Sequence, residues 1–184
     1  MLDNEATLIS HAQRDPQAFG MLYDHYVERI YAYVQREVRD ISVAQDIVSN
    51  TFEKALKNLP RYRWRGTSFG AWLYQIARNE IRMHYRRQNR LQFSFLNIRT
   101  EENAEQRVLQ RDNQDHIVLA LQQLSAMDQE LLKLRYYEDL SNAEIATILN
   151  KSPGTIAVAL HRALKRLRQK FENQEQEIKN YVRA

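Results

Sequence analysis

The chain contains no cysteine in its 184 residues, and only four glycines and three prolines. The missing cysteines exclude disulfides, thiol nucleophiles and cysteine metal sites, and they suit a reducing cytoplasm. So few turn residues disfavour all-β and open α/β folds and indicate a helical protein. No stretch approaches the ~18 apolar residues of a spanning helix, and the first residues lack a signal-peptide pattern. We therefore expect a soluble, cytoplasmic, all-α protein with no membrane insertion.

Charge is unevenly distributed, although the formal net charge is only +4. Residues 61–90 carry eight basic side chains and one acidic one, and residues 151–184 carry eight basic and three acidic ones. Between them, residues 112–150 carry seven acidic and two basic side chains. Two separate basic segments predict contact with a polyanion at two places.

Apolar residues recur every three or four positions in three segments of the N-terminal half, which predicts three helices there. These segments are 19–34, 44–55 and 69–81. In the third segment, arginines spaced by four residues predict an exposed stripe opposite the buried one. The stripe consists of Arg78, Arg82 and Arg86.

Four further helices are predicted in the C-terminal half. Ile117, Val118, Leu121 and Leu124 mark the apolar face of the first. Ser141 and Glu144 have the spacing of a capping box, and Ser152 followed by Pro153 is another helix start. In the last helix the inward residues are expected to be Ile156, Leu160, Ala163, Leu164 and Leu167. A short helix, a brief break and a basic final helix form a helix-turn-helix pattern.

The helical period is lost over residues 91–111, where Phe93 and Phe95 are followed by a polar stretch. We therefore expect two small helical domains, at 1–90 and 112–184, joined by this linker. A free linker seldom carries two phenylalanines, so its first half is expected to dock on a surface.

The helix-turn-helix pattern predicts duplex DNA binding, with an ordinary helical hairpin as the alternative. Ala157 and Val158 on the outward face offer contact only to a thymine methyl group, which predicts weak base readout and mostly backbone positioning.

A second nucleic-acid signal lies between Pro60 and Ser68, where aromatic side chains alternate with arginines. Tyr62, Arg63, Trp64 and Arg65 have the composition of a loop that stacks unpaired bases while cations hold the phosphates. The alternative is that Tyr62 and Trp64 pack underneath the loop, and the composition alone leaves both interpretations open.

Two blocks of this sequence resemble bacterial sigma factors. Residues 44–55 and 69–87 resemble regions 2.2 to 2.4, through Ala44-Gln45-Asp46-Ile47-Val48 and Phe69-Gly70-Ala71-Trp72-Leu73 among others. Residues 140–167, with Glu144-Ile145-Ala146 and Gly154-Thr155-Ile156, resemble region 4.2. With only these two domains, the chain is similar to the extracytoplasmic-function group (group 4) of the sigma-70 family. The resemblance implies an RNA polymerase sigma factor that recognises −10 and −35 promoter elements and promotes strand opening in transcription initiation.

The resemblance also implies roles for individual residues. Those implied to grip the clamp helices of core RNA polymerase are Asp46, Ile47, Val48, Asn50, Phe52, Glu53 and Lys54. Those implied for the single-stranded −10 element are Tyr62, Arg63, Trp64, Arg65, Asn79, Arg82, Arg86 and Arg87. Those expected at the −35 element are Ser152, Thr155, Val158, His161, Arg162, Lys165 and Arg166. Departures from the family pattern are Ser49-Asn50, where Gln-Glu is usual, and the apolar run 157–159.

The implied partners are core RNA polymerase, through its clamp helices and flap, promoter DNA, and an anti-sigma factor. The histidines lack metal-ligand spacing, and the sequence has no glycine-rich phosphate loop or nucleophile elbow, so we expect no metal, no cofactor and no enzyme activity. Two alternatives stay open: a stand-alone duplex-binding regulator, and a decoy that binds polymerase or an inhibitor but not promoters.

Overall fold

The computed structural model describes residues 4–94 and 112–183, and all regular secondary structure in these ranges is helical. The chain forms two compact units, which we describe separately. Residues 146–151 lie within and directly after helix α7, and we describe them with the second unit. The predicted all-α, two-domain fold is confirmed; the expected linker lies largely outside the described residues.

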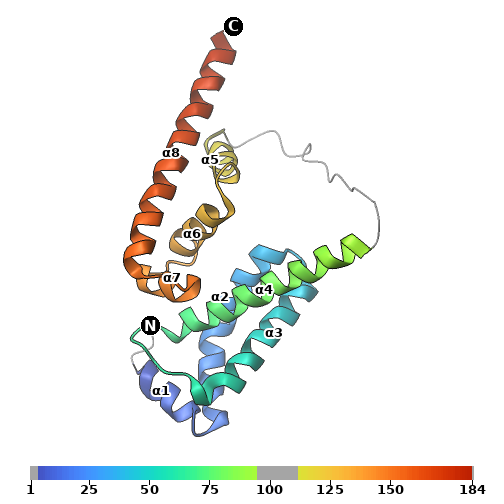
Figure 1. Ribbon diagram of the computed structural model, residues 1–184, viewed down its shortest axis with the longest axis vertical. Coiled ribbons are helices and arrows are strands. Elements are labelled where there is room, and N and C mark those ends of the chain that lie inside the picture. Colours follow the sequence, from blue (N-terminus) through green and yellow to red (C-terminus); the bar gives the residue numbers. More distant parts are fainter. Residues whose placement is uncertain (1–3, 95–111, 184) are drawn as a thin grey trace. The chain divides into compact units, whose positions relative to one another are not determined.

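The first unit contains four α-helices and two short 3-10 turns (Figure 1). They are α1 (Glu5–Ala12), η1 (Pro16–Ala18), α2 (Phe19–Val38), α3 (Ile41–Asn58), η2 (Leu59–Arg61) and α4 (Phe69–Ser94). Helix α3 begins where the Asp40 carboxylate accepts a hydrogen bond from the Val43 backbone N–H at 3.0 Å, as an N-cap does. Helix α4 continues to Ser94, past the expected domain boundary at residue 90.

Helices α2, α3 and α4 pack against one another and enclose the core of the first unit. Its fully buried side chains include Leu22, Ile30, Val34, Leu59, Phe69 and Leu73. Gly70 allows a close approach of α4 to α2, because a Cβ atom there would lie 2.6 Å from Cε1 of Tyr26.

The prediction that Arg78 belongs to an exposed stripe on α4 is wrong, because Arg78 is only 8% exposed. Residues four apart on a helix drift about 40° around its axis, so a stripe rotates away from its starting face along a long helix. Arg78 therefore lies on the packed side of α4, whereas Arg82 and Arg86 are exposed.

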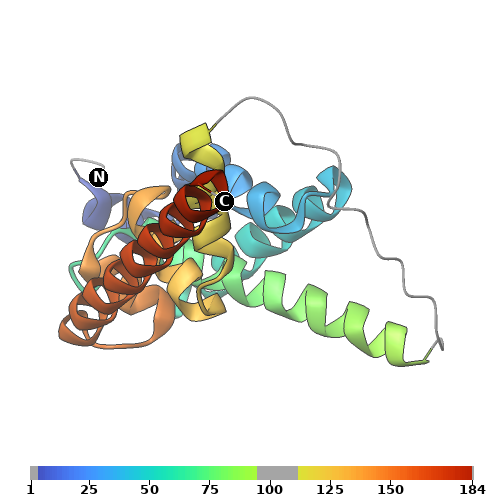
Figure 2. The ribbon, with the colours of Figure 1, turned by 90° about the horizontal axis from the view of Figure 1, so that it is seen from above.

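The second unit contains α5 (Asp112–Gln122), α6 (Ala126–Tyr136), α7 (Asn142–Leu149) and α8 (Pro153–Arg183), with α5 and α6 both packed on α8 (Figure 2). The N-termini of α7 and α8 are capped by the predicted side chains. Ser141 N–H donates to Oε2 of Glu144 at 2.9 Å, and Glu144 N–H donates to the Ser141 hydroxyl at 3.3 Å. Thr155 N–H likewise donates to the Ser152 hydroxyl at 3.1 Å.

Two expectations about the core of the second unit are wrong. Ile117 and Val118 are about half exposed, because α5 turns Ala120 inward instead; Leu124, just after α5, is buried as expected. Leu164 is 39% exposed, since Leu160 and Ala163 occupy the inward face of α8 at that level.

Candidate nucleic-acid interfaces

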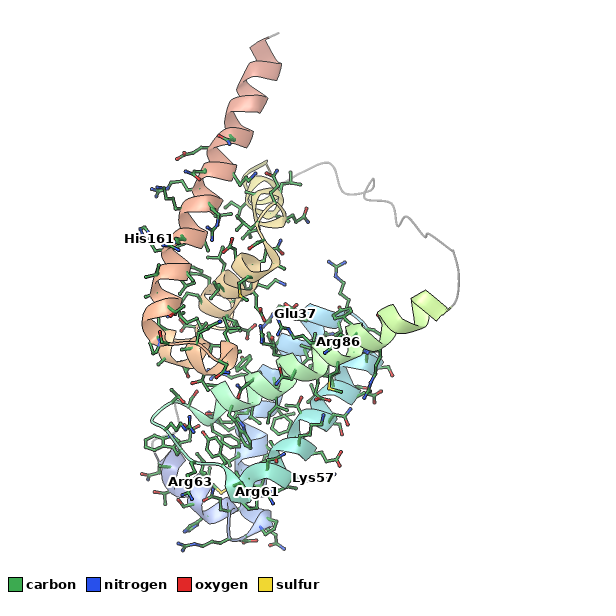
Figure 3. All side chains as sticks on the ribbon, in the orientation of Figure 1. Glu37, Lys57, Arg61, Arg63, Arg86 and His161 are labelled. Atoms are coloured by element: carbon green, nitrogen blue, oxygen red, sulfur yellow. The ribbon has the colours of Figure 1, made fainter. Side chains whose placement is uncertain are left out.

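The basic–aromatic loop, residues 62–68, connects η2 to α4. Arg63, Trp64 and Arg65 are all exposed, and Trp64 keeps 47% of its surface accessible. Gly66 has φ +78°, a left-handed conformation that glycine adopts at little cost and that turns the chain back toward α4. Figure 3 shows Arg61 and Arg63 at one end of the first unit and Arg86 on the C-terminal half of α4. An exposed indole between two guanidinium groups can stack a base while the cations hold its phosphates.

Tyr62 behaves differently from Trp64, although both are aromatic residues of the same loop. Its ring lies 4.4 Å from the Trp72 ring and 5.4 Å from the Phe69 ring, measured between centroids. Burial, assisted by the negative charge of Glu5, raises the pKa of Tyr62 to about 12. The Tyr62 ring therefore packs on α4, as the packing alternative describes, whereas the Trp64 ring is left exposed.

The outer face of α4 carries Asn79, Arg82, Arg86 and Arg87, and all four are exposed. Close to this face the Tyr85 hydroxyl donates a hydrogen bond of 2.6 Å to the Glu37 carbonyl at the end of α2. Lys54 of α3 forms an ion pair of 2.5 Å with Glu80 of α4. These contacts fix α4 against the bundle and leave Arg82, Arg86 and Arg87 exposed.

The residues of α3 implied to bind polymerase divide into two sets. Asp46, Asn50, Glu53 and Lys54 are exposed, whereas Ile47, Val48 and Phe52 are 4–6% exposed and belong to the core. The Glu53 carboxylate pairs with Lys57, whose hydrogen bond lowers the pKa of Glu53. Four of these seven side chains are therefore exposed on α3, and the other three pack beneath them.

An apolar groove of about 700 Å³ runs between α2 and α3 beside these exposed residues. Its lining includes Tyr23, Val27 and Tyr31 from α2 and Val48, Phe52 and Leu56 from α3. Glu28 and Glu53 add acidic groups to it. Sequence reasoning missed this groove, because it depends on how two helices pack.

In the second unit, Thr155, Val158, His161, Arg162 and Lys165 are exposed on α8, and Ser152 caps the helix. Figure 3 shows His161 on the side of α8 away from α5 and α6. Basic side chains along this free face can contact phosphates of a duplex.

Arg166 of the same helix is also exposed, but its side chain is paired within the fold. Its guanidinium donates to both carboxylate oxygens of the buried Asp128 on α6, from Nε to Oδ2 at 2.9 Å and from Nη2 to Oδ1 at 2.7 Å. This bidentate pair lowers the pKa of Asp128. Arg166 thus ties α8 to α6, while about half of its side chain stays exposed.

Helix α1 is a feature that sequence reasoning missed. Glu5 is buried and accepts a hydrogen bond from the Tyr26 hydroxyl, while Ile9 and Ala12 are 2–3% exposed. The side-chain amide of Gln13 donates to the Leu59 and Tyr62 carbonyls. The only signal in the sequence is the spacing of Glu5, Ile9 and Ala12, which is too short a pattern to separate from chance.

Comparison with known proteins identifies the family. The Sigma-70 region 2 model matches residues 22–91, and the Sigma-70, region 4 model matches residues 115–167. The RNA polymerase sigma factor YlaC of Bacillus subtilis is 30% identical over 162 residues, covering 85% of this chain and 93% of that protein. The chain belongs to the sigma-70 family of RNA polymerase sigma factors.

Other relatives place this sigma factor in the extracytoplasmic-function group. The ECF RNA polymerase sigma factor BldN of Streptomyces coelicolor is 32% identical over 166 residues, covering 87% of this chain; the chain spans 63% of the length of BldN. Among solved structures, that of CnrH in complex with the cytosolic domain of CnrY shares the fold, with a TM-score of 0.64 and 21% identity over 93% of this chain and 99% of that one.

The matched regions coincide with the surfaces described above. The region 2 match contains the basic–aromatic loop and the exposed arginines of α4, and the region 4 match contains the free face of α8. Helix α1 and Gln13 precede the region 2 match. Within residues 4–94 and 112–183, no helix is long and apolar enough to cross a membrane, and no three His, Asp or Glu side chains are grouped to hold a metal ion.

Proposed function

We propose that this sigma factor recruits core RNA polymerase in the cytoplasm and directs it to promoters through two DNA contacts of different kinds, with no catalytic chemistry of its own. The first contact is with unpaired bases of a −10 element, and the second is with the duplex of a −35 element.

Exposed Trp64 between Arg63 and Arg65 is the single observation that carries this proposal. Burial of an indole is normally favourable, so a tryptophan left accessible on a basic loop is available to a ligand with a π-face. Unstacking a base costs a few kcal/mol, which stacking on an aromatic side chain can offset. Arg82, Arg86 and Arg87 then extend the cationic path along α4 for the same strand, and Asn79 adds a neutral amide to it.

For the duplex contact, α8 enters the major groove with Thr155, Val158 and His161 near the bases, while Arg162 and Lys165 contact phosphates. Val158 is 52% exposed and can only pack on a thymine methyl group or exclude other bases. Affinity at this element therefore depends more on the backbone than on base identity.

For polymerase binding, we propose that Asp46, Asn50, Glu53 and Lys54 contact the clamp helices, with the apolar groove between α2 and α3 receiving side chains of the same partner. The second unit is proposed to contact the flap. The solved sigma factor RpoE of Bartonella quintana, 24% identical with a TM-score of 0.59, is in complex with the anti-sigma factor NepR. We propose that an anti-sigma factor likewise restrains this chain.

Transcription of a fragmented bacterial genome by core polymerase, with and without the protein, tests this proposal. We expect RNA starts that depend on the protein and share two upstream elements. Protein-dependent starts rule out a decoy that binds polymerase without promoters. If the protein alone binds duplex DNA and no new starts appear, the result would instead support a stand-alone regulator that acts without polymerase.

A further inference from the structure

Gln13 connects the N-terminal helix to the basic–aromatic loop. It follows α1 directly and is half-buried, and its side-chain Nε2 donates two hydrogen bonds to a segment more than forty residues further along the chain. One reaches the Leu59 carbonyl at 3.0 Å, and the other reaches the Tyr62 carbonyl at 2.7 Å. A single amide therefore bridges the first residue of η2 and the first residue of the loop.

We propose that Gln13 is a positioning residue for the capture of unpaired DNA, acting by holding the loop so that Trp64 is presented in one orientation. This inference rests on the proposed function of the loop. It goes beyond that function because Gln13 lies outside the matched family region and acts through the loop backbone.

Helix α1, which Gln13 follows, is packed firmly on the first unit. Ile9 and Ala12 bury the apolar side of α1, and the buried Glu5 accepts a hydrogen bond from the Tyr26 hydroxyl. Tyr26 in turn packs beside Phe69, with ring centroids 6.0 Å apart. Helix α1 is thereby fastened to α2 next to the start of α4, in the region where Figure 1 shows it beside the connection into α4.

The other end of the loop is also fixed. The Ser68 hydroxyl accepts a hydrogen bond of 3.3 Å from the Ala71 N–H in the first turn of α4. With Gln13 at the first residue and Ser68 at the last, the loop backbone is held at both ends, while Arg63, Trp64 and Arg65 between them are exposed. A loop ordered before binding loses less conformational entropy when it takes up a strand, so its affinity is higher.

Three substitutions separate positioning from packing. Gln13→Met keeps the length of the side chain and removes the donor, whereas Gln13→Lys, which is one bond longer, restores a donor for the two carbonyls. Gln17→Met is the matched control, because Gln17 is an exposed glutamine on the neighbouring η1.

The experiment uses the full chain bound to bacterial core polymerase. Wild-type holoenzyme first selects from a pool of short single-stranded DNA of random sequence, and the most enriched strand becomes the probe. We expect Gln13→Met to bind this probe roughly tenfold more weakly, as for the loss of two hydrogen bonds. Gln13→Lys should recover most of the loss, Gln17→Met should match wild type, and all variants should bind core polymerase equally.

Each other outcome has a separate meaning. If wild type enriches a strand and Gln13→Met binds it equally well, the positioning role is wrong while the proposed function stands. A parallel loss of core binding, or failure of Gln13→Lys to restore the affinity, would show that Gln13 serves the fold as a whole and would also overturn the inference. If wild-type holoenzyme enriches no strand, the proposed function fails and this inference fails with it.

Discussion

The two proposed DNA-binding surfaces of this sigma factor differ in the side chains that they expose. The first unit presents a large aromatic ring, Trp64, between arginines on a loop that is fixed at both ends. The second unit presents Ala157 and Val158 on a regular helix, with Arg162 and Lys165 following. An indole on a loop suits bases that have left the stack, whereas small side chains on a helix suit the walls of an intact groove. The comparison favours the proposal that the first unit captures unpaired bases and the second unit positions the duplex.

Each surface also has one arginine that is withdrawn from solvent or paired within the fold. In the first unit Arg78 is buried, and in the second Arg166 is paired with Asp128. Arginine spacing on a helix therefore overstates the number of cations available to DNA, and the packed neighbours decide which ones remain.

The largest expected effect is that of Trp64→Ala on strand capture. Base–aromatic stacking contributes about 1–3 kcal/mol per base, so the affinity for single-stranded −10 DNA should fall roughly 10- to 100-fold. Holoenzyme binding to fluorescent single strands measures this, together with permanganate reactivity of the opened promoter. Trp64→Phe is the control that keeps a ring. An equal loss of affinity for core polymerase would mean that Trp64 supports the fold instead.

The helices of this surface could be predicted from sequence, but the roles of its side chains only in part. Apolar spacing identified α2, α3 and α4, because a helix that buries one face needs that period. Composition left Tyr62 and Trp64 equivalent, since only the positions of Phe69 and Trp72 decide which ring is covered. The role of Gln13 could not be predicted from sequence patterns, because its two acceptors are backbone carbonyls, which every residue has.

The next effect concerns the pair that holds the second unit together. Arg166→Met leaves the Asp128 carboxylate buried without its main donor, which should destabilise the second unit by about 2 kcal/mol. Both tryptophans lie in the first unit, so fluorescence does not report on this change. Hydrogen exchange of the α6 and α8 amides at neutral pH does. Arg168→Met, at an exposed position of the same helix, should leave the exchange rates unchanged.

The same pair predicts a pH dependence with a definite sign. The hydrogen bond from Arg166 lowers the pKa of Asp128 in the folded state below its unfolded value. Its stabilising contribution is therefore complete above about pH 4 and is lost as the pH falls through the folded pKa. Exchange in α6 and α8 should accelerate on acidification in wild type, and Asp128→Asn should lack this component. Identical acid profiles for the two proteins would contradict the assignment.

A smaller effect is expected from the cations of α8. Replacing Arg162 and Lys165 together by Ala removes two proposed phosphate contacts, which should lower the salt dependence of duplex binding by about two in the log–log slope. Titrations of holoenzyme on promoter duplexes at several salt concentrations measure the slope. The loss should be the same on all sequences, and a loss confined to one −35 sequence would mean that these residues read bases.

The smallest expected effect is on stability, when one residue with a left-handed backbone conformation is replaced in each unit. Arg39 at the end of α2 has φ 59° and Asn150 in the turn before α8 has φ 53°, both in the left-handed region. Glycine adopts this conformation without steric cost, and asparagine tolerates it better than arginine does. Arg39→Gly should therefore stabilise the first unit by about 1 kcal/mol, and Asn150→Gly should stabilise the second by roughly half as much. Tryptophan fluorescence in urea measures the first change and hydrogen exchange in α7 the second. Asn150→Ala is the control that should destabilise, because alanine has neither the freedom of glycine nor the tolerance of asparagine; equal stability of Ala and Asn at this position would show that the turn carries no strain.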